Sequence, residues 1–224
     1  MTLKTEWNQL IQNLINQGIL HSLNIIRAMK LVSREHYIPE RIRAHYATDT
    51  PLPIGNGQTI SAPHMIAIMN EALQLEEGLK VLEIGTGSGW HASTIAETIA
   101  PSDSPKQTWG HIYTTEIIPE LAEYAKENIT KTGYADRITI INTDGSQGYP
   151  PETPYDRILV TAAAPNIPKP LTDQLKPDAI LVIPVGTTLF YQTLIRITKK
   201  DTQLLKEDLG GVAFVPLTGK YGQQ

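Results

Sequence analysis

The sequence predicts an α/β fold built on a doubly wound, mostly parallel sheet. Short apolar runs alternate with stretches of helical periodicity in five successive units between residues 76 and 185. One of these runs stops at three glycines, Gly85, Gly87 and Gly89, and a helical pattern follows directly. The 224 residues, 41% of them hydrophobic, suit a single domain with its own core. We therefore expect parallel strands joined by right-handed crossovers.

This single domain, residues 1–224, divides into three parts. Residues 1–75 form a helical and loop addition, residues 76–185 form the core, and residues 186–224 form C-terminal strands. Apolar residues recur at three- and four-residue steps between residues 5 and 31, with a break near Gly18, which predicts two amphipathic helices. No internal repeats are found.

The segment before the core contains the least periodic part of the chain. Residues 46–58 hold several prolines and glycines, so we expect a structured loop that folds over a ligand. Ser61 stands just ahead of Pro63 and an apolar helical pattern, so we expect Ser61 to cap this helix. Gly78 should end the helix and begin the first strand of the core.

The core elements follow from the periodicity in order. A strand ends at Ile84, a helix spans residues 90–100, and the breaker-rich residues 101–107 form an exposed insertion. Further predicted elements are a strand at 111–115, a helix at 119–132, a strand at 138–142, a strand at 158–164 that ends in small residues, a helix at 170–175 and a strand at 179–184. Residues 189–198 and 203–215 alternate as antiparallel edge strands would.

The composition excludes several classes of function. Lys and Arg total 19 against 23 Asp and Glu, a net charge of −4, which argues against binding to nucleic acid phosphates. No run of apolar residues has membrane-spanning length and the N-terminus lacks a signal-peptide pattern, so we expect a cytoplasmic protein without a membrane partner. The chain has no cysteine, and its six histidines include no closely spaced pair, so we expect no metal site. We also expect a monomer.

The glycine turn indicates a nucleotide-type ligand, because glycines let backbone approach a ligand closely. A dinucleotide motif would require glycine at the position of Trp90, and the chain instead has Glu83 before a G-x-G-x-G turn. Glu116, at the tip of the second strand, could accept both hydroxyls of a ribose. Asp144, after the third strand, could meet an adenine amino group or only form an Asp-Gly turn. A glycine-rich turn without a ligand remains the alternative for the whole motif.

Taken together, these motifs resemble those of the protein-L-isoaspartate O-methyltransferases. The resemblance covers nearly the whole chain, and the segment from Pro51 to His64 is its most distinctive part. It rests on residues 51–55, 57–64, 81–89, 143–145, 160–163 and 214–217, in the family's order. The resemblance implies a Rossmann-like class I methyltransferase that transfers a methyl group from S-adenosyl-L-methionine to the free α-carboxylate of L-isoaspartyl residues in proteins and peptides, which starts their repair.

The resemblance also implies roles for individual residues. It makes Ser61 and Thr59 the catalytic residues. The implied cofactor-binding residues are Ile60, His64, Glu83, Gly85, Thr86, Gly87, Ser88, Gly89, Glu116, Asp144, Gly145 and Thr218. The chain departs from the family pattern in the insertion at 101–107, in Thr114-Thr115-Glu116 at the second strand end and in Thr143, where a glycine is commoner.

Two other functions remain open at this point. A class I methyltransferase for another acceptor would share the glycine turn, Glu116 and Asp144, but would not need the segment from Thr59 to His64. A protein that binds S-adenosylmethionine without turnover would share the cofactor motifs alone. The methyl transfer itself needs no general base, because a carboxylate is already anionic at neutral pH. The absence of a recognisable catalytic triad is therefore expected.

Overall fold

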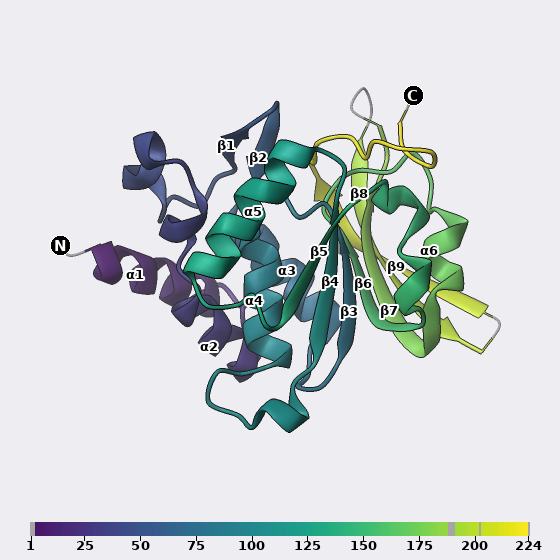
Figure 1. Cartoon of the computed structure of the whole chain (residues 1–224), viewed down its shortest axis with the longest axis horizontal. Coiled ribbons are helices and arrows are strands. Elements are labelled where there is room, and N and C mark those ends of the chain that lie inside the picture. The colour runs from purple at the N-terminus through teal and green to yellow at the C-terminus, as the bar shows by residue number, and fades with distance from the viewer. Residues whose placement is uncertain (1–2, 188–190, 202, 224) are drawn as a thin grey trace.

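The computed structural model describes residues 3–187, 191–201 and 203–223, and it confirms the predicted α/β fold (Figure 1). The helices are α1 (Leu3–Asn16), α2 (Leu23–Leu31), α3 (Pro63–Leu73), α4 (Trp90–Ile99), α5 (Pro119–Lys131) and α6 (Lys169–Asp173). The strands are β1 (Leu52–Gly55), β2 (Gln58–Ile60), β3 (Lys80–Ile84), β4 (His111–Glu116), β5 (Ile138–Asn142), β6 (Tyr155–Val160), β7 (Leu175–Val185), β8 (Gln192–Lys200) and β9 (Gln203–Val212). Short 3-10 turns are η1 (Arg34–Tyr37), η2 (Glu40–His45), η3 (Lys106–Thr108), η4 (Gly145–Gln147) and η5 (Pro150–Glu152).

The main sheet has the order β5-β4-β3-β6-β7-β8-β9. Strands β3 to β7 pair in parallel, and β8 and β9 are added as antiparallel strands at one edge. The strand order reverses between β3 and β6, so the connections leave these two neighbouring strands in opposite directions. In doubly wound sheets, ligands bind at this switch point, outside the carboxyl ends of the strands.

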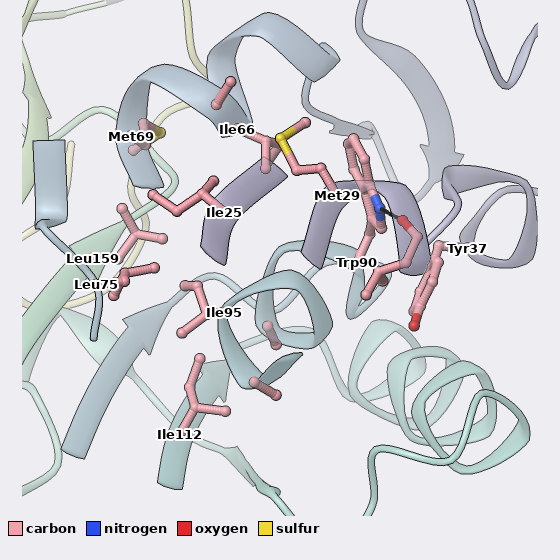
Figure 2. Packing of buried hydrophobic residues seen from close by; sticks show 14 of the residues in the cluster. Ile25, Met29, Tyr37, Ile66, Met69, Leu75, Trp90, Ile95, Ile112 and Leu159 are labelled. Carbon is pink, nitrogen blue, oxygen red and sulfur yellow. Dashed lines mark hydrogen bonds between the residues drawn. The ribbon is translucent and has the colours of Figure 1, made fainter. Parts of the chain in front are cut away.

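Each face of the sheet is covered by a separate layer of apolar side chains, as expected for parallel strands buried on both sides. On one face, Val81, Ile112 and Leu159 pack against the helices α1 to α5. Figure 2 shows part of this cluster, in which Ile95 of α4 lies between the sheet and the N-terminal helices. On the other face, Leu82 and its neighbours pack against the short helix α6.

The two predicted N-terminal helices are present as α1 and α2, and the chain turns between them at Gly18, whose φ is +72°. Two buried tryptophans fix the pair to the domain. The Trp7 indole donates a hydrogen bond to the carbonyl of Met29 at 2.8 Å, and the Trp90 indole donates one to the carbonyl of Val32 at 3.0 Å. The addition at residues 1–75 is thereby packed onto α4 and shares the main core.

The prediction of a loop at residues 46–58 was wrong in part. The strands β1 and β2 form an antiparallel hairpin within and just beyond it. Its turn is Asn56-Gly57, with both φ angles positive, +50° and +71°, which is the combination that two-residue hairpins favour. The prolines of the segment concealed this turn signal.

The expected cap of α3 was also wrong. Ala62 occupies the N-cap position in an extended conformation, Pro63 is the first helical residue, and no side chain caps the helix. Ser61 therefore lies one residue outside the cap. Its hydroxyl is free of that structural task.

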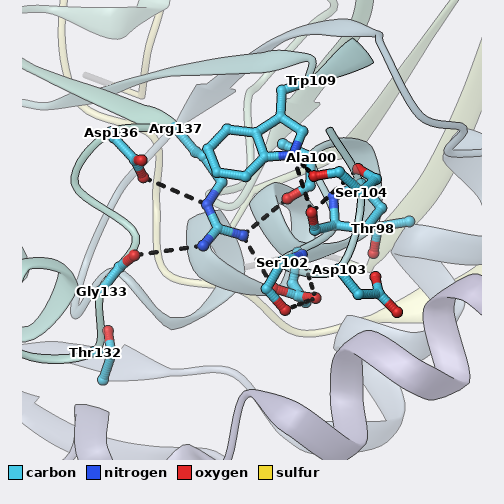
Figure 3. A network of polar contacts seen from close by, with 12 residues as sticks. Thr98, Ala100, Ser102, Asp103, Ser104, Trp109, Thr132, Gly133, Asp136 and Arg137 are labelled. Carbon is cyan, nitrogen blue, oxygen red and sulfur yellow. Dashed lines mark hydrogen bonds and ion pairs between the residues drawn. The ribbon is translucent and has the colours of Figure 1, made fainter. Parts of the chain in front are cut away.

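The insertion at residues 101–107 is largely exposed, as predicted, but side chains hold its ends (Figure 3). Arg137, which is buried, donates to the carboxylate of Glu97 at 3.0 Å and to the carbonyl of Ala100 at 2.8 Å. The Trp109 indole donates to the carbonyl of Pro101, and the Arg137 guanidinium lies 4.6 Å from the Trp109 ring centre. The insertion is thus anchored on the face of the sheet opposite α6, at the end of α4.

The two C-terminal strands are antiparallel, as predicted, with bounds that differ from the prediction. β8 begins at Gln192, and the predicted strand residues Leu189 and Phe190 lie outside the described residues. β9 ends at Val212, three residues earlier than predicted, because the following segment turns back toward β6. This return places residues 215–218 at the carboxyl ends of the parallel strands.

Candidate active site

A cavity lies at the switch point, over the carboxyl ends of β3, β4 and β6. Six separate segments supply its walls: β2 with the start of α3, the glycine turn with the start of α4, the end of β4 with the start of α5, the turn η4 after β5, the end of β6, and the segment after β9. The lining residues are Gln58, Thr59, Ile60, Ser61, Ile66, Ile84, Gly85, Thr86, Gly87, Ser88, Trp90, His91, Thr115, Glu116, Ile117, Ile118, Leu121, Gly145, Thr161, Ala162, Val215, Pro216, Leu217 and Thr218.

The glycine turn forms the floor of this cavity, and two of its glycines have no tolerance for a side chain. A Cβ on Gly85, at φ +96°, would collide with the Thr161 side chain of β6's continuation. A Cβ on Gly89, at φ +85°, would stand 2.9 Å from the Ile129 side chain of α5. The close approach of β6 and α5 to the turn therefore depends on glycine at both positions. At Gly85 and Gly87, which line the cavity, only main-chain atoms can face it.

Glu116 holds the turn and the next helix together while facing the cavity. One carboxylate oxygen accepts from the Gly87 amide at 2.9 Å, and the other accepts from the Ile118 amide at 3.0 Å. Each carboxylate oxygen has a second acceptor position, so two ribose hydroxyls can still bind. The side chains of Ile117, Ile118 and Leu121 form an apolar wall beside it, which the sequence analysis missed.

Glu83 is fully buried and does not line the cavity. Its Oε2 accepts a hydrogen bond from Thr114 Oγ1 at 2.5 Å, and Oε1 has no partner within hydrogen-bonding distance. His91 Nδ1 lies 4.0 Å away, and this ring is bonded through Nε2 to the Asn70 side chain. Burial raises the pKa of Glu83 to about 8 and lowers the pKa of His91 to about 3, so both are neutral at pH 7 in the free protein.

The segment from Thr59 to Ser61 forms the wall opposite the glycine turn. Thr59 is exposed, Ile60 is buried, and Ser61 is half-buried. Arg34, fully buried, donates to the carbonyls of Thr48 at 3.0 Å and of Ile60 at 3.3 Å. This guanidinium therefore fixes the backbone immediately before Ser61.

His64 does not line this cavity; it lines a second hollow that adjoins the first. Its amide and its Nδ1 both lie 2.9 Å from the same carboxylate oxygen of Asp49. His64 is thus separated from the predicted cofactor residues that line the first cavity. His64 lies in the first turn of α3, beyond Thr59 and Ser61, which line both hollows.

Asp144 tethers the C-terminal segment. Its carboxylate accepts from the Ser146 amide at 2.9 Å and from the Lys220 amide at 2.9 Å. Burial acts to raise the pKa of Asp144, but these hydrogen bonds outweigh it and lower the pKa. The side chain caps the turn η4, as an Asp-Gly turn would, and at the same time secures the stretch that brings Thr218 to the cavity.

The structure brings most of the predicted site residues together. Glycine-turn residues 85–88, Glu116, Gly145, Thr218 and residues 59–61 all line one cavity. Gly89 and Asp144 lie behind it as structural supports, and Glu83 and His64 are placed as described above. The small residues at the end of the fourth parallel strand do leave room, since Thr161 and Ala162 line the cavity. Within the described residues, no group of His, Cys, Asp and Glu could hold a metal ion.

A G-x-G-x-G turn at the switch point, an acidic residue at the end of the neighbouring strand and a seven-stranded sheet with antiparallel edge strands together match the arrangement of class I methyltransferases. Comparison with protein families identifies which one. The family model described as Protein-L-isoaspartate(D-aspartate) O-methyltransferase (PCMT) matches residues 5–222. The chain belongs to this family, and it is an S-adenosyl-L-methionine-dependent carboxyl O-methyltransferase.

Individual relatives agree with this assignment. A protein-L-isoaspartate O-methyltransferase of Hyperthermus butylicus is 51% identical over 214 residues, which covers 96% of this chain and 89% of the relative. One of Korarchaeum cryptofilum is also 51% identical and covers 96% of this chain and 97% of the relative. Among solved structures, a Plasmodium falciparum protein described as this enzyme, in complex with S-adenosyl-L-homocysteine, has a TM-score of 0.83 and 29% identity, and the match covers 95% of this chain and 98% of that one.

Proposed function

We propose that the protein transfers a methyl group from S-adenosyl-L-methionine to the free α-carboxylate of L-isoaspartyl residues in damaged proteins and peptides. The observation that carries this proposal is the junction between the two hollows. Thr59, Ser61 and Thr161 line both of them. Three hydroxyl side chains therefore stand where an acceptor entering from the outer hollow meets a methyl donor in the inner one.

The inner cavity has the features that S-adenosyl-L-methionine requires. Glu116 would accept the ribose hydroxyls, and the apolar wall of Ile117 and Leu121 would contact the adenine. The exposed backbone of the glycine turn would run beside the methionine part. When bound, the cofactor supplies an electrophilic methyl group on a sulfonium. Glu83, neutral behind the turn, would support the turn through Thr114 and Thr86, whose hydroxyls lie 2.7 Å apart.

The chain's own residues need only position and desolvate the acceptor. A carboxylate oxygen forms a bond to the methyl carbon as the bond from that carbon to sulfur breaks, and the electron pair stays on sulfur. No proton moves, so no general base is required. Holding the reacting atoms at near-attack distance can supply roughly 7–11 kcal/mol. Ser61 and Thr59 would hold the carboxylate through their hydroxyls, while His64 is engaged with Asp49.

The test compares three peptides that differ in one residue. The peptides carry L-isoaspartate, L-aspartate or asparagine at the same position, and methyl-ester formation is measured with labelled S-adenosyl-L-methionine. We expect esterification of the isoaspartyl peptide only. Equal rates on the aspartyl peptide would point to another acceptor, and cofactor binding without any ester would support a protein that binds without turnover.

The cellular setting belongs to the same proposal. We expect a cytoplasmic monomer that acts on isoaspartyl proteins and has no nucleic-acid or membrane partner. The net charge of −4 supports the exclusion of nucleic acid. In the described part of the chain, no helix is both long enough and apolar enough to cross a membrane. Sedimentation at several protein concentrations would test the monomer.

A further inference from the structure

The outer hollow is an apolar surface built around an exposed aromatic ring. Its apolar lining residues include Pro51, Met65, Tyr191, Val212 and Phe214, which we call the flank subsite. Tyr191 is 76% exposed, so most of its apolar ring is in contact with solvent and is available to pack against a ligand. Met65, Val212 and Phe214 are half-buried and rest on the main core. The subsite thus has a base fixed by the core and one wall, the Tyr191 ring, that is largely exposed.

Specific contacts fix the shape of this subsite. The Gln192 side chain accepts from the Phe214 amide at 2.7 Å and donates to the Phe214 carbonyl at 3.1 Å, so the segment after β9 is held in place. A Cβ on Gly211 would overlap the Tyr191 ring. Glycine at this position is therefore what lets the tyrosine lie against β9. The base of the hollow is therefore formed by the fold, since Met65, Val212 and Phe214 pack against the main core.

The subsite carries little charge. Among the described residues that line it, none is Asp, Glu, Lys or Arg. The His64 ring and amide are already engaged with Asp49. An acidic side chain entering here would lose water and find no cation in return. An apolar or aromatic side chain would be desolvated against Tyr191, Met65 and Phe214.

We infer that the flank subsite binds an apolar or aromatic side chain next to the isoaspartyl residue, so that the enzyme prefers damaged sites with such a neighbour. This inference rests on the proposed function, because the subsite is continuous with the methyl-transfer cavity through Ser61, Thr59 and Thr161. An acceptor carboxylate held at that junction leaves the adjacent part of the peptide in the outer hollow. The occupant is therefore the substrate peptide itself.

The experiment uses isoaspartyl peptides in which the residue on either side of isoaspartate is phenylalanine, glycine or glutamate. With the full-length enzyme, kcat/KM should fall in that order for the side that enters the subsite. The aromatic contact should be worth about two- to tenfold between phenylalanine and glycine. The difference should appear in KM, because the ring touches the neighbouring side chain and not the reacting carboxylate.

Tyr191→Ala should abolish the preference for phenylalanine over glycine, because the aromatic wall of the subsite is lost. Leu205→Ala is the matched control, because Leu205 is also exposed, at 52%, but pairs with Thr198 far along β9. It should keep the preference. An enzyme that methylates all isoaspartyl peptides alike, or a Tyr191→Ala variant that keeps the preference, overturns the subsite while the proposed function stands. Inactivity on every isoaspartyl peptide overturns the proposed function and the subsite with it.

Discussion

Replacement of Ser61 by alanine tests the catalytic assignment directly, because the structure removes the competing structural role. The N-cap of α3 is Ala62, so Ser61 does not stabilise the helix through its side chain. We therefore expect a change in unfolding free energy below about 0.5 kcal/mol, as at ordinary surface positions. A true N-cap would lose about 1 kcal/mol.

The effect on activity should be much larger. A hydrogen bond to a charged group is worth roughly 1.5–3 kcal/mol. If the Ser61 hydroxyl holds the acceptor carboxylate, kcat/KM on an isoaspartyl peptide should fall about ten- to 150-fold. The affinity for S-adenosyl-L-homocysteine should then change little, because the proposed hydrogen bond is to the acceptor and not to the cofactor. Ser104→Ala, whose hydroxyl bonds only to the carbonyl of Pro101 in the insertion, is the control and should be fully active.

Urea denaturation and initial rates on the same preparations separate the two effects. A Ser61→Ala enzyme with normal kcat/KM would refute the role of this hydroxyl in holding the acceptor. An enzyme whose stability and activity fall together would show that the serine supports the local backbone after all. Either outcome would mean that the Ser61 hydroxyl, although it lines both hollows, does not act by binding the acceptor carboxylate.

Three further predictions concern groups that support the cavity. Glu116→Ala should raise the Kd for S-adenosyl-L-homocysteine at least tenfold, which is about 1.4 kcal/mol or more of binding free energy. It should also lower the free energy of unfolding by about 1–3 kcal/mol, because the Gly87 and Ile118 amides lose their acceptor. An unchanged affinity in calorimetry would contradict this prediction. Burial raises the pKa of Glu83 to about 8, so its proton stabilises the fold fully below pH 4.5 and this stabilisation is lost as the pH rises to about 8. His91, whose pKa is lowered to about 3, has the opposite effect as the pH rises through 6.5, and this effect is the same in the wild type and in Glu83→Gln. Between pH 6.5 and 8 the free energy of unfolding of the unliganded wild type should therefore fall, relative to that of Glu83→Gln, by up to about 1.4 kcal/mol per pH unit. Urea denaturation of both proteins across this pH range measures the difference. Parallel curves of unfolding free energy against pH would argue against a neutral Glu83. Arg34→Met should lower the free energy of unfolding by roughly 2–4 kcal/mol, because the carbonyls of Thr48, Thr50 and Ile60 lose a charged donor. An unchanged midpoint of urea denaturation would show that water replaces the guanidinium.

The alternation of strands and helices was predictable because each parallel strand is a short apolar run buried on both faces. Val81, Leu82 and Ile84 show this pattern. The same pattern could have predicted the burial of Glu83, since it shares a sheet face with Val81, two residues earlier. A carboxylate on that face must lie under α4. Because Glu83 directly precedes the glycine motif, the resemblance implied a cofactor-binding residue instead of a buried one.

Other features depend on contacts between segments far apart in the sequence. Asp144 bonds to the Lys220 amide, 76 residues away, and Arg34 bonds to the carbonyl of Ile60, 26 residues away. No local pattern specifies such partners, because only the packed fold brings them together. The cap of α3 failed for a local reason: Pro63 begins the helix, and the residue directly before it takes the cap.

The donor and acceptor sides of the site come from different parts of the chain. The core supplies the glycine turn and Glu116, which many methyltransferases need, while the addition at residues 1–75 supplies the wall that contains Thr59 and Ser61. Arg34 joins this wall to the core, because it donates to the carbonyl of Ile60 and its guanidinium lies 5.4 Å from the ring centre of Trp90, the first residue of α4 after the turn. One buried arginine thus contacts both the helix that follows the glycine turn and the backbone next to Ser61. Loss of this contact should therefore impair methyl transfer more than cofactor binding.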